Sequence, residues 1–172
     1  MEGSLEKFLD RLSVVIGALL FIQTPLFISQ YRGQLIGHFN ELLLQIGAIR
    51  QAAESSNKTL EQWIDKFVKS SDPDFSRQGA LMQEMVNRGQ ALSESILSLD
   101  NASIFSKPWL FLQHLDYAIF KSTLSSFQMG IPFTYEGFCY LLLGMLFGYF
   151  TYQGLRKIAN TLFSIAFKRS AV

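Results

Sequence analysis

The chain has 172 residues, of which 49% are hydrophobic and 17% are charged. Soluble domains carry about 25% charged residues, so this chain is poor in charge, and its mean hydropathy is positive, at +0.20. The formal net charge of +1 excludes the basic excess typical of nucleic-acid binding. The single cysteine excludes an internal disulfide and a multi-cysteine zinc site.

Two uncharged apolar runs, one near each end of the chain, are the strongest signal. The first covers residues 12–31 and the second covers residues 137–155, and each is bounded by charged residues. A helix that rises about 1.5 Å per residue needs roughly 20 residues to cross an apolar layer about 30 Å thick. Both runs therefore predict transmembrane helices.

The first run could also be a signal peptide that is removed. It ends in Gln-Thr-Pro-Leu-Phe-Ile-Ser, which lacks the small-x-small pattern of a cleavage site, and the charges before it are mixed in sign. We therefore expect an uncleaved anchor.

Basic residues near the ends of the runs predict the topology. Lys7 and Arg11 precede the first run, and four basic residues follow the second run in the tail. Residues 1–11 and 156–172 are therefore expected to be cytoplasmic tails. Residues 32–136 are expected on the other side, which is the periplasm if the host membrane is a bacterial inner membrane.

The segment between the runs is predicted to be helical throughout. Thr59 with Gln62 has the form of a capping box, and Asp72-Pro73 has the form of an Asp cap followed by a first-turn proline. The predicted helices cover about 33–56, 59–70, 73–99 and 107–127.

Two of these helices carry apolar stripes that step by four and three residues, which is the spacing of a coiled-coil seam. One seam is Leu35, Phe39, Leu42, Ile46 and Ile49, and the other is Met82, Met85, Leu92, Ile96 and Leu99. The seams can pair with each other in an antiparallel hairpin, or each can be buried against a second copy of the chain. The predicted fold class is thus all-α, with two transmembrane helices and a coiled-coil-like helical segment between them.

Two later segments have two interpretations each. The 107–127 helix is apolar over more than half of its circumference, so it is either packed on both sides or lies in the membrane interface. The basic tail 156–172 either lies on the cytoplasmic leaflet as an amphipathic helix or extends the second span.

Glycines four residues apart in the second run, Gly144 and Gly148, form a Gly-x-x-x-Gly pattern, with Gly137 on nearly the same side. In membrane helices this pattern lets two backbones approach closely. The partner helix is either the first span, which offers Gly17 and Ala18, or another subunit.

His114 and Asp116 are the only pair that resembles a chemical site, together with Glu136 at the edge of the second run. Residues two apart on a helix do not face each other, so a structural role is favoured over a catalytic one. Glu136 suits the first turn of a helix, where the dipole favours a negative charge. No catalytic, cofactor or metal site is predicted.

The order of these features resembles an uncharacterised family of bacterial inner-membrane proteins, domain of unknown function 2937. The resemblance rests on four short motifs. These are Gln23-Thr24-Pro25, Ser71-Asp72-Pro73-Asp74-Phe75, His114-Leu115-Asp116 and Pro132-Phe133-Thr134-Tyr135-Glu136-Gly137. It implies a two-span protein of a Gram-negative host, and it implies no activity and no catalytic residues.

These features favour a non-enzymatic scaffold or accessory subunit of the inner membrane. It would act through helix–helix association in a homo-oligomer or with a membrane-protein partner, in contact with membrane lipids. The alternative is a component of an envelope transport system that binds a lipid or a small apolar ligand between the 107–127 helix and the seams.

Overall fold

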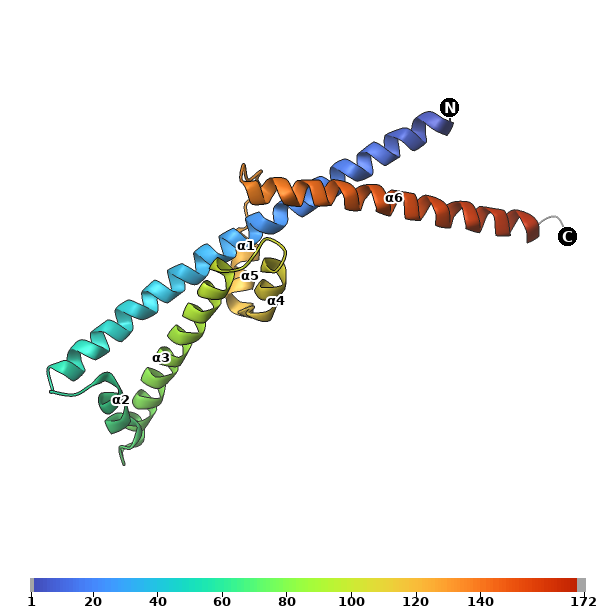
Figure 1. Cartoon of the computed structure of the whole chain (residues 1–172). Helices are drawn as coiled ribbons and strands as arrows, with labels where there is room; N and C mark the ends of the chain where they lie inside the picture. The colour runs from blue at the N-terminus through green and yellow to red at the C-terminus, as the bar shows by residue number, and fades with distance from the viewer. Residues whose placement is uncertain (1, 170–172) are drawn as a thin grey trace. The chain divides into compact units, whose positions relative to one another are not determined.

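A computed structural model describes residues 2–169 and the side chains of residues 8–158. All regular elements in this part of the chain are helices, so the all-helical prediction is confirmed. They are α1 (Glu2–Glu54), α2 (Leu60–Val68), α3 (Pro73–Asp100), α4 (Lys107–Gln113), α5 (Tyr117–Ser126) and α6 (Tyr135–Arg169) (Figure 1). Met1 and the last residues of the predicted tail, 170–172, lie outside the described residues.

The two longest helices carry the apolar runs. α1 has 53 residues and continues from the first run into the first seam without a break, although Pro25 lies inside it. α6 has 35 residues and continues from the second run through Arg169, so the described part of the tail extends that helix. Both helices are long and apolar enough to cross a membrane.

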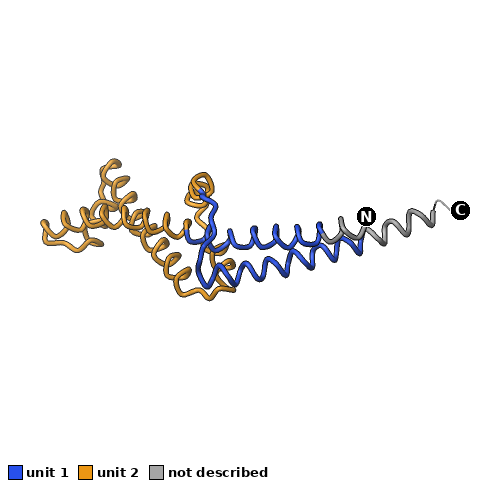
Figure 2. Tube along the Cα trace, turned by 90° about the horizontal axis from the view of Figure 1, so that it is seen from above, with its two compact units in different colours: residues 1–29, 127–172 blue, residues 30–126 orange. Residues whose placement is uncertain are grey.

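The chain divides into two compact units (Figure 2). Unit 1 contains residues 1–29 and 127–172, and unit 2 contains residues 30–126. In unit 1, α1 and α6 pack side by side, with the rings of Phe21 and Phe147 centred 5.1 Å apart. Large apolar side chains around this contact are exposed, including Val15, Leu19, Leu20, Leu142, Leu146 and Phe150.

In unit 2, α1, α2 and α3 meet in a cluster of large apolar side chains. Its buried members are Ile46, Leu60, Ile64 and Met82, and Ile49, Trp63, Met85 and Val86 pack against them. The short helix α2 lies close against α3 because Gly79 has no side chain. A Cβ atom at this position would lie 2.7 Å from the backbone carbonyl carbon of Phe67.

Local capping signals set where α2 and α3 begin, as predicted. The Thr59 hydroxyl accepts the Gln62 N–H at 3.2 Å, and the Gln62 side chain accepts the Thr59 N–H at 3.1 Å, which completes the capping box. The Asp72 carboxylate accepts the Asp74 N–H at 2.9 Å, with Pro73 at the first helical position. The sequence positions of both caps are therefore confirmed.

The prediction of one helix over 107–127 is wrong, because the structure has two helices there, α4 and α5, separated at His114–Asp116. The Asp116 carboxylate accepts the N–H groups of Ala118 and Ile119 at 2.9 and 3.1 Å, which makes Asp116 the N-cap of α5. The Asp116 N–H is donated to the Tyr31 hydroxyl at 2.8 Å. A continuous helix would need that N–H for its own backbone.

Candidate functional site

The crossing of α1 and α6 in unit 1 is built on glycine. A Cβ atom on Gly17 would lie 3.0 Å from the Cα atom of Gly148, and one on Gly144 would lie 2.9 Å from the Cα atom of Ala18. A Cβ atom on Gly148 would lie 3.0 Å from the Cα atom of Val14. These approaches leave no room for a side chain, so the helices touch backbone to backbone, as Gly-x-x-x-Gly helices do.

The glycine contact answers a question that the sequence leaves open. The neighbour of Gly144 and Gly148 in the structure is the first apolar helix of the same chain. The atoms closest to Gly137 belong to the turn before α6 and not to α1. A Cβ atom on Gly137 would lie 3.1 Å from the Pro132 ring and 3.3 Å from the Thr134 hydroxyl oxygen. Gly137 therefore fits the turn before α6, where its N–H is donated to the Thr134 hydroxyl at 3.1 Å.

The predicted seams lie on the inner side of unit 2. The buried members are Leu35, Ile46, Met82, Leu92 and Leu99, and the half-buried members are Phe39, Leu42, Ile49, Met85 and Ile96. A Cβ atom on Gly89 of α3 would lie 3.3 Å from the Cδ1 atom of Ile46 on α1. Of the two alternatives for the seams, the structure therefore has pairing within the chain, and α2 takes part in it.

A polar joint surrounds the break between α4 and α5. The Tyr31 side chain is fully buried and donates its hydroxyl to the His114 backbone carbonyl at 3.5 Å, while accepting the Asp116 N–H. The Arg88 guanidinium lies 3.4 Å from the Asp116 carboxylate. The rings of Tyr31 and Phe111 pack edge to face at 5.0 Å. The two Tyr31 contacts bind main-chain groups on both sides of the break, so the joint helps to fix where α4 ends and α5 begins.

The three residues that resemble a chemical site in the sequence, His114, Asp116 and Glu136, do not share one unit. His114 and Asp116 belong to unit 2, and Glu136 belongs to unit 1, in the first turn of α6. Asp116 already acts as a helix cap and an ion-pair partner, and the contact of His114 with Tyr31 uses its backbone. Sequence reasoning missed Tyr31 and Arg88, which complete the joint.

A second polar contact joins α1 to α3 in unit 2. The Arg32 guanidinium forms a two-pronged ion pair with Asp100, in which Nε faces Oδ1 and Nη2 lies 2.6 Å from Oδ2. The hydrogen bond from Arg32 lowers the pKa of the Asp100 carboxyl below its ordinary value. Both side chains are more than one-third exposed, so water screens much of this attraction.

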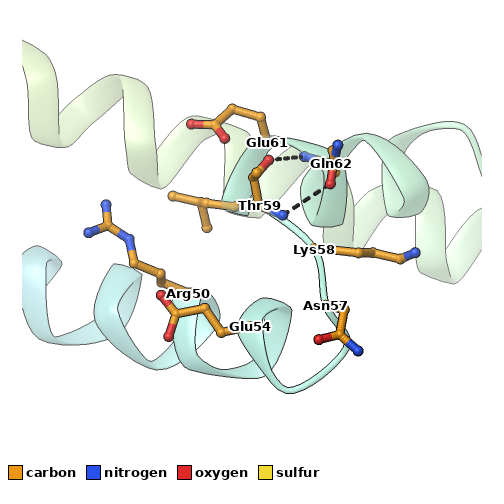
Figure 3. A pocket seen from close by; sticks show the side chains of 8 residues that line it. Arg50, Glu54, Asn57, Lys58, Thr59, Glu61 and Gln62 are labelled. Carbon is orange, nitrogen blue, oxygen red and sulfur yellow. Dashed lines mark hydrogen bonds between the residues drawn. The ribbon is translucent and has the colours of Figure 1, made fainter.

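An open pocket of about 540 Å³ lies where α1 ends and α2 begins (Figure 3). Arg50 and Lys58 bring positive charge to its lining, and Glu54 and Glu61 bring negative charge. The pKa of the Glu61 carboxyl is lowered by hydrogen bonds to its own backbone N–H and to the Thr59 hydroxyl. The capping box already uses the N–H groups of Thr59 and Gln62, as the dashed lines in Figure 3 show, so these donors are not free to bind a ligand in the pocket.

No group of three or more histidine, cysteine, aspartate or glutamate side chains suited to a metal ion occurs among the described residues. No curated protein and no solved structure matches the chain significantly. The family model for the protein of unknown function DUF2937 matches residues 5–164, which is nearly the whole chain. The resemblance carried by the four short motifs is thereby confirmed, and the chain belongs to the DUF2937 family.

Proposed function

We propose that this chain is a non-enzymatic integral membrane scaffold or accessory subunit that acts through helix–helix association. Its two apolar helices would span a bacterial inner membrane, with both termini cytoplasmic and unit 2 in the periplasm. The apolar windows of α1 and α6 are only 28% and 17% buried, whereas the core helix of a soluble protein is mostly buried. The antiparallel order of the glycine contacts supports termini on one side.

The observation that carries the association is the outward face of α1 in unit 2. Leu44 is 78% exposed, although it lies two residues from the buried Ile46 and therefore on the opposite side of the helix. Gly33, Gly37 and Gly47 fall near the same outward line, and a Cβ atom on any of them would meet nothing within 4 Å. Glycine inside a helix costs about 1 kcal/mol relative to alanine, and no contact within the chain requires it here.

This face favours a second helix as its neighbour, and a second copy of the chain is the simplest source. The residues along the line are uncharged from Gly33 to Gln51, namely Gly33, Gly37, Asn40, Leu44, Gly47 and Gln51. A like copy would meet no charge repulsion along this line, and the missing side chains would let the backbones approach. Helix–helix packing between two copies of α1 would give this segment the coiled-coil-like character predicted from the sequence.

Site-directed crosslinking in native membranes tests this proposal. Cys139→Ala would remove the native thiol, and Leu44→Cys would place a single thiol on the outward face, with the exposed Gln90→Cys on α3 as the control. A crosslinked band of twice the chain mass, formed only by Leu44→Cys, would support a homo-oligomer. A single defined band of another mass would indicate an accessory subunit. Equal, weak crosslinking of both variants would contradict association through this face.

The topology needs its own test. In a Cys139→Ala background, a cysteine at Gln90, which is exposed on α3 and lies off the proposed association face, should react with a membrane-impermeant maleimide applied to intact spheroplasts, if unit 2 is periplasmic. A cysteine at Lys157, beyond the second run, should react only after the membrane is opened. The reverse pattern would contradict the proposed orientation and leave the association proposal standing.

A further inference from the structure

The segment between α5 and α6 exposes large apolar side chains at every second position. Residues 127–134 have no helix, and the exposed fractions of Met129, Ile131, Phe133 and Tyr135 are 83%, 59%, 86% and 80%. No charged residue occurs from Ser122 to Tyr135. Loops that face water are rich in polar residues, and contiguous exposed apolar groups mark a contact surface.

Contacts within unit 1 tie this segment to a defined level of α1. The Gln23 side chain donates to the Gly130 backbone carbonyl at 3.2 Å, and the rings of Phe27 and Phe127 are centred 5.2 Å apart. A Cβ atom on Gly130 would lie 3.5 Å from the Cδ2 atom of Leu26. All three α1 residues lie inside the uncharged run, about 7 to 14 Å along the helix before its first outer charge, Arg32.

The glycine crossing gives the same level independently. Gly17 and Gly144 face each other, because a Cβ atom on either would meet the carbonyl oxygen of the other. Tyr135 lies nine residues before Gly144, and in antiparallel helices it is therefore level with the residue nine beyond Gly17, which is Leu26. The start of α6 and the segment before it thus lie beside the outer part of the first apolar run.

Backbone at that level of a bilayer needs partners for its polar groups, because lipid offers none. In this segment the Gly130 carbonyl accepts from Gln23 and Pro132 has no N–H to satisfy, and at the start of α6 the Thr134 hydroxyl accepts the N–H of Gly137. This pattern also gives a reason for a glutamine inside an apolar run.

We propose that Met129, Ile131, Phe133 and Tyr135 form a lipid-contact surface that inserts into the outer layer of the bilayer. This inference rests on the proposal that α1 and α6 span the membrane. Lipid is the occupant favoured by the level of the segment in unit 1, by its lack of charge and by its continuity with the exposed apolar faces of both helices. Tyr135, at the start of α6, suits the boundary between acyl chains and headgroups.

Tryptophan fluorescence in vesicles tests the proposal on the full chain. Trp63→Phe and Trp109→Phe would remove the native tryptophans, and Phe133→Trp would place one in the segment. The vesicles would contain phosphatidylcholine brominated either near the glycerol end or near the methyl end of the acyl chains. We expect several-fold stronger quenching than for Trp63 alone in unit 2, and stronger quenching by bromine near the glycerol end.

Two further variants separate the possible failures. Leu20→Trp places the fluorophore at an exposed position within α1, and Met129→Trp repeats the test at a second position of the segment. Unquenched Leu20→Trp would contradict the membrane-spanning proposal itself. Quenched Leu20→Trp, with Phe133→Trp and Met129→Trp no more quenched than Trp63, would overturn the lipid-contact surface and leave the spans in place.

Discussion

In unit 1, α1 and α6 meet through glycines, whereas in unit 2 the helices surround a cluster of isoleucine, leucine and methionine side chains, and glycine brings only α2 close to α3. In water, burial of apolar side chains stabilises the folded state by about 25 cal/mol per Å² of apolar surface removed from water. In lipid, burial of apolar side chains gives no such stabilisation, because the acyl chains are as apolar as leucine. Helices in a membrane therefore associate through close backbone packing. α1 takes part in both kinds of contact, as expected of one helix that passes from lipid into water under the proposed function.

The exposed side chains of the two units also differ in polarity. Around the crossing in unit 1, the exposed side chains are leucine, valine and phenylalanine. Around the cluster in unit 2, charged side chains are exposed, including Lys66, Arg77, Glu84 and Arg88. This difference agrees with the proposal that unit 1 lies in lipid and unit 2 in water, under which substitutions should affect the two units by different mechanisms.

The largest effect is expected at the backbone contact of unit 1. Gly144→Leu would place a side chain where Ala18 and Phe21 of α1 already lie, so the crossing should separate. A cysteine pair at Phe21 and Phe147, in a Cys139→Ala background, should be linked by a short bifunctional thiol reagent in the parent chain and lose most of this crosslink with Gly144→Leu.

Gly154→Leu is the matched control, because it changes the same residue type on the same helix where a Cβ atom would meet nothing within 4 Å. This variant should keep the Phe21–Phe147 crosslink. Equal crosslinking in the Gly144 and Gly154 variants would mean that the backbone contact does not hold unit 1 together, and the comparison between the units would fail.

The next largest effect is expected in unit 2, where glycine-to-alanine substitution should change the free energy of unfolding in opposite directions at two positions. Gly79→Ala would push a methyl group into the backbone of α2 and should lower the free energy of unfolding by about 1–3 kcal/mol. In detergent-dissociated single chains, Gly47→Ala on α1 has no neighbour within the chain and should raise it by about 0.5–1 kcal/mol. Denaturant unfolding in mild detergent, followed by Trp63 fluorescence, measures both, and a stabilising Gly79→Ala would refute the tight α2–α3 contact.

A smaller effect is expected at the polar joint of unit 2. Tyr31→Phe removes the hydroxyl that accepts the Asp116 N–H and should lower the free energy of unfolding by about 1–2 kcal/mol. Tyr117→Phe, at an exposed position, should change it by less than about 0.5 kcal/mol. His114→Ala should also be mild, because the contact with Tyr31 uses the His114 backbone. A large loss of unfolding free energy for His114→Ala, with a small loss for Tyr31→Phe, would instead mean that the His114 imidazole stabilises the joint.

Local signals explain most of what the sequence could predict. The caps at Thr59, Asp72 and Thr134 each involve residues within three positions of one another, so a short stretch of sequence contains both donor and acceptor. The break at Asp116 has a local part too, since its side chain caps α5. Its other part is Tyr31, 85 positions away, and no short pattern contains that contact.

The glycine pattern shows a second limit. Gly144 and Gly148 identify a packing face, but the identity of the neighbour depends on tertiary contacts with Gly17. Gly137 lies seven residues before Gly144 and on nearly the same side of the helix, yet its close neighbours belong to the turn before α6. The ion pair of Arg32 with Asp100 could have been predicted from the sequence. Antiparallel pairing of the seams brings residues just before Leu35 near residues just after Leu99.

That ion pair provides the smallest expected effect, and one that the apolar crossing of unit 1 should not show. Because the folded-state pKa of Asp100 is lowered, its contribution is full above the unfolded-state pKa and is lost as the pH falls through the folded-state pKa, below the ordinary value of 3.8. Solvent screening limits it to about 0.5 kcal/mol. Asp100→Asn should therefore lower the free energy of unfolding slightly at pH 7 and not at low pH, and high salt should shrink the difference. A loss that persists at low pH would mean that Asp100 acts through packing rather than charge.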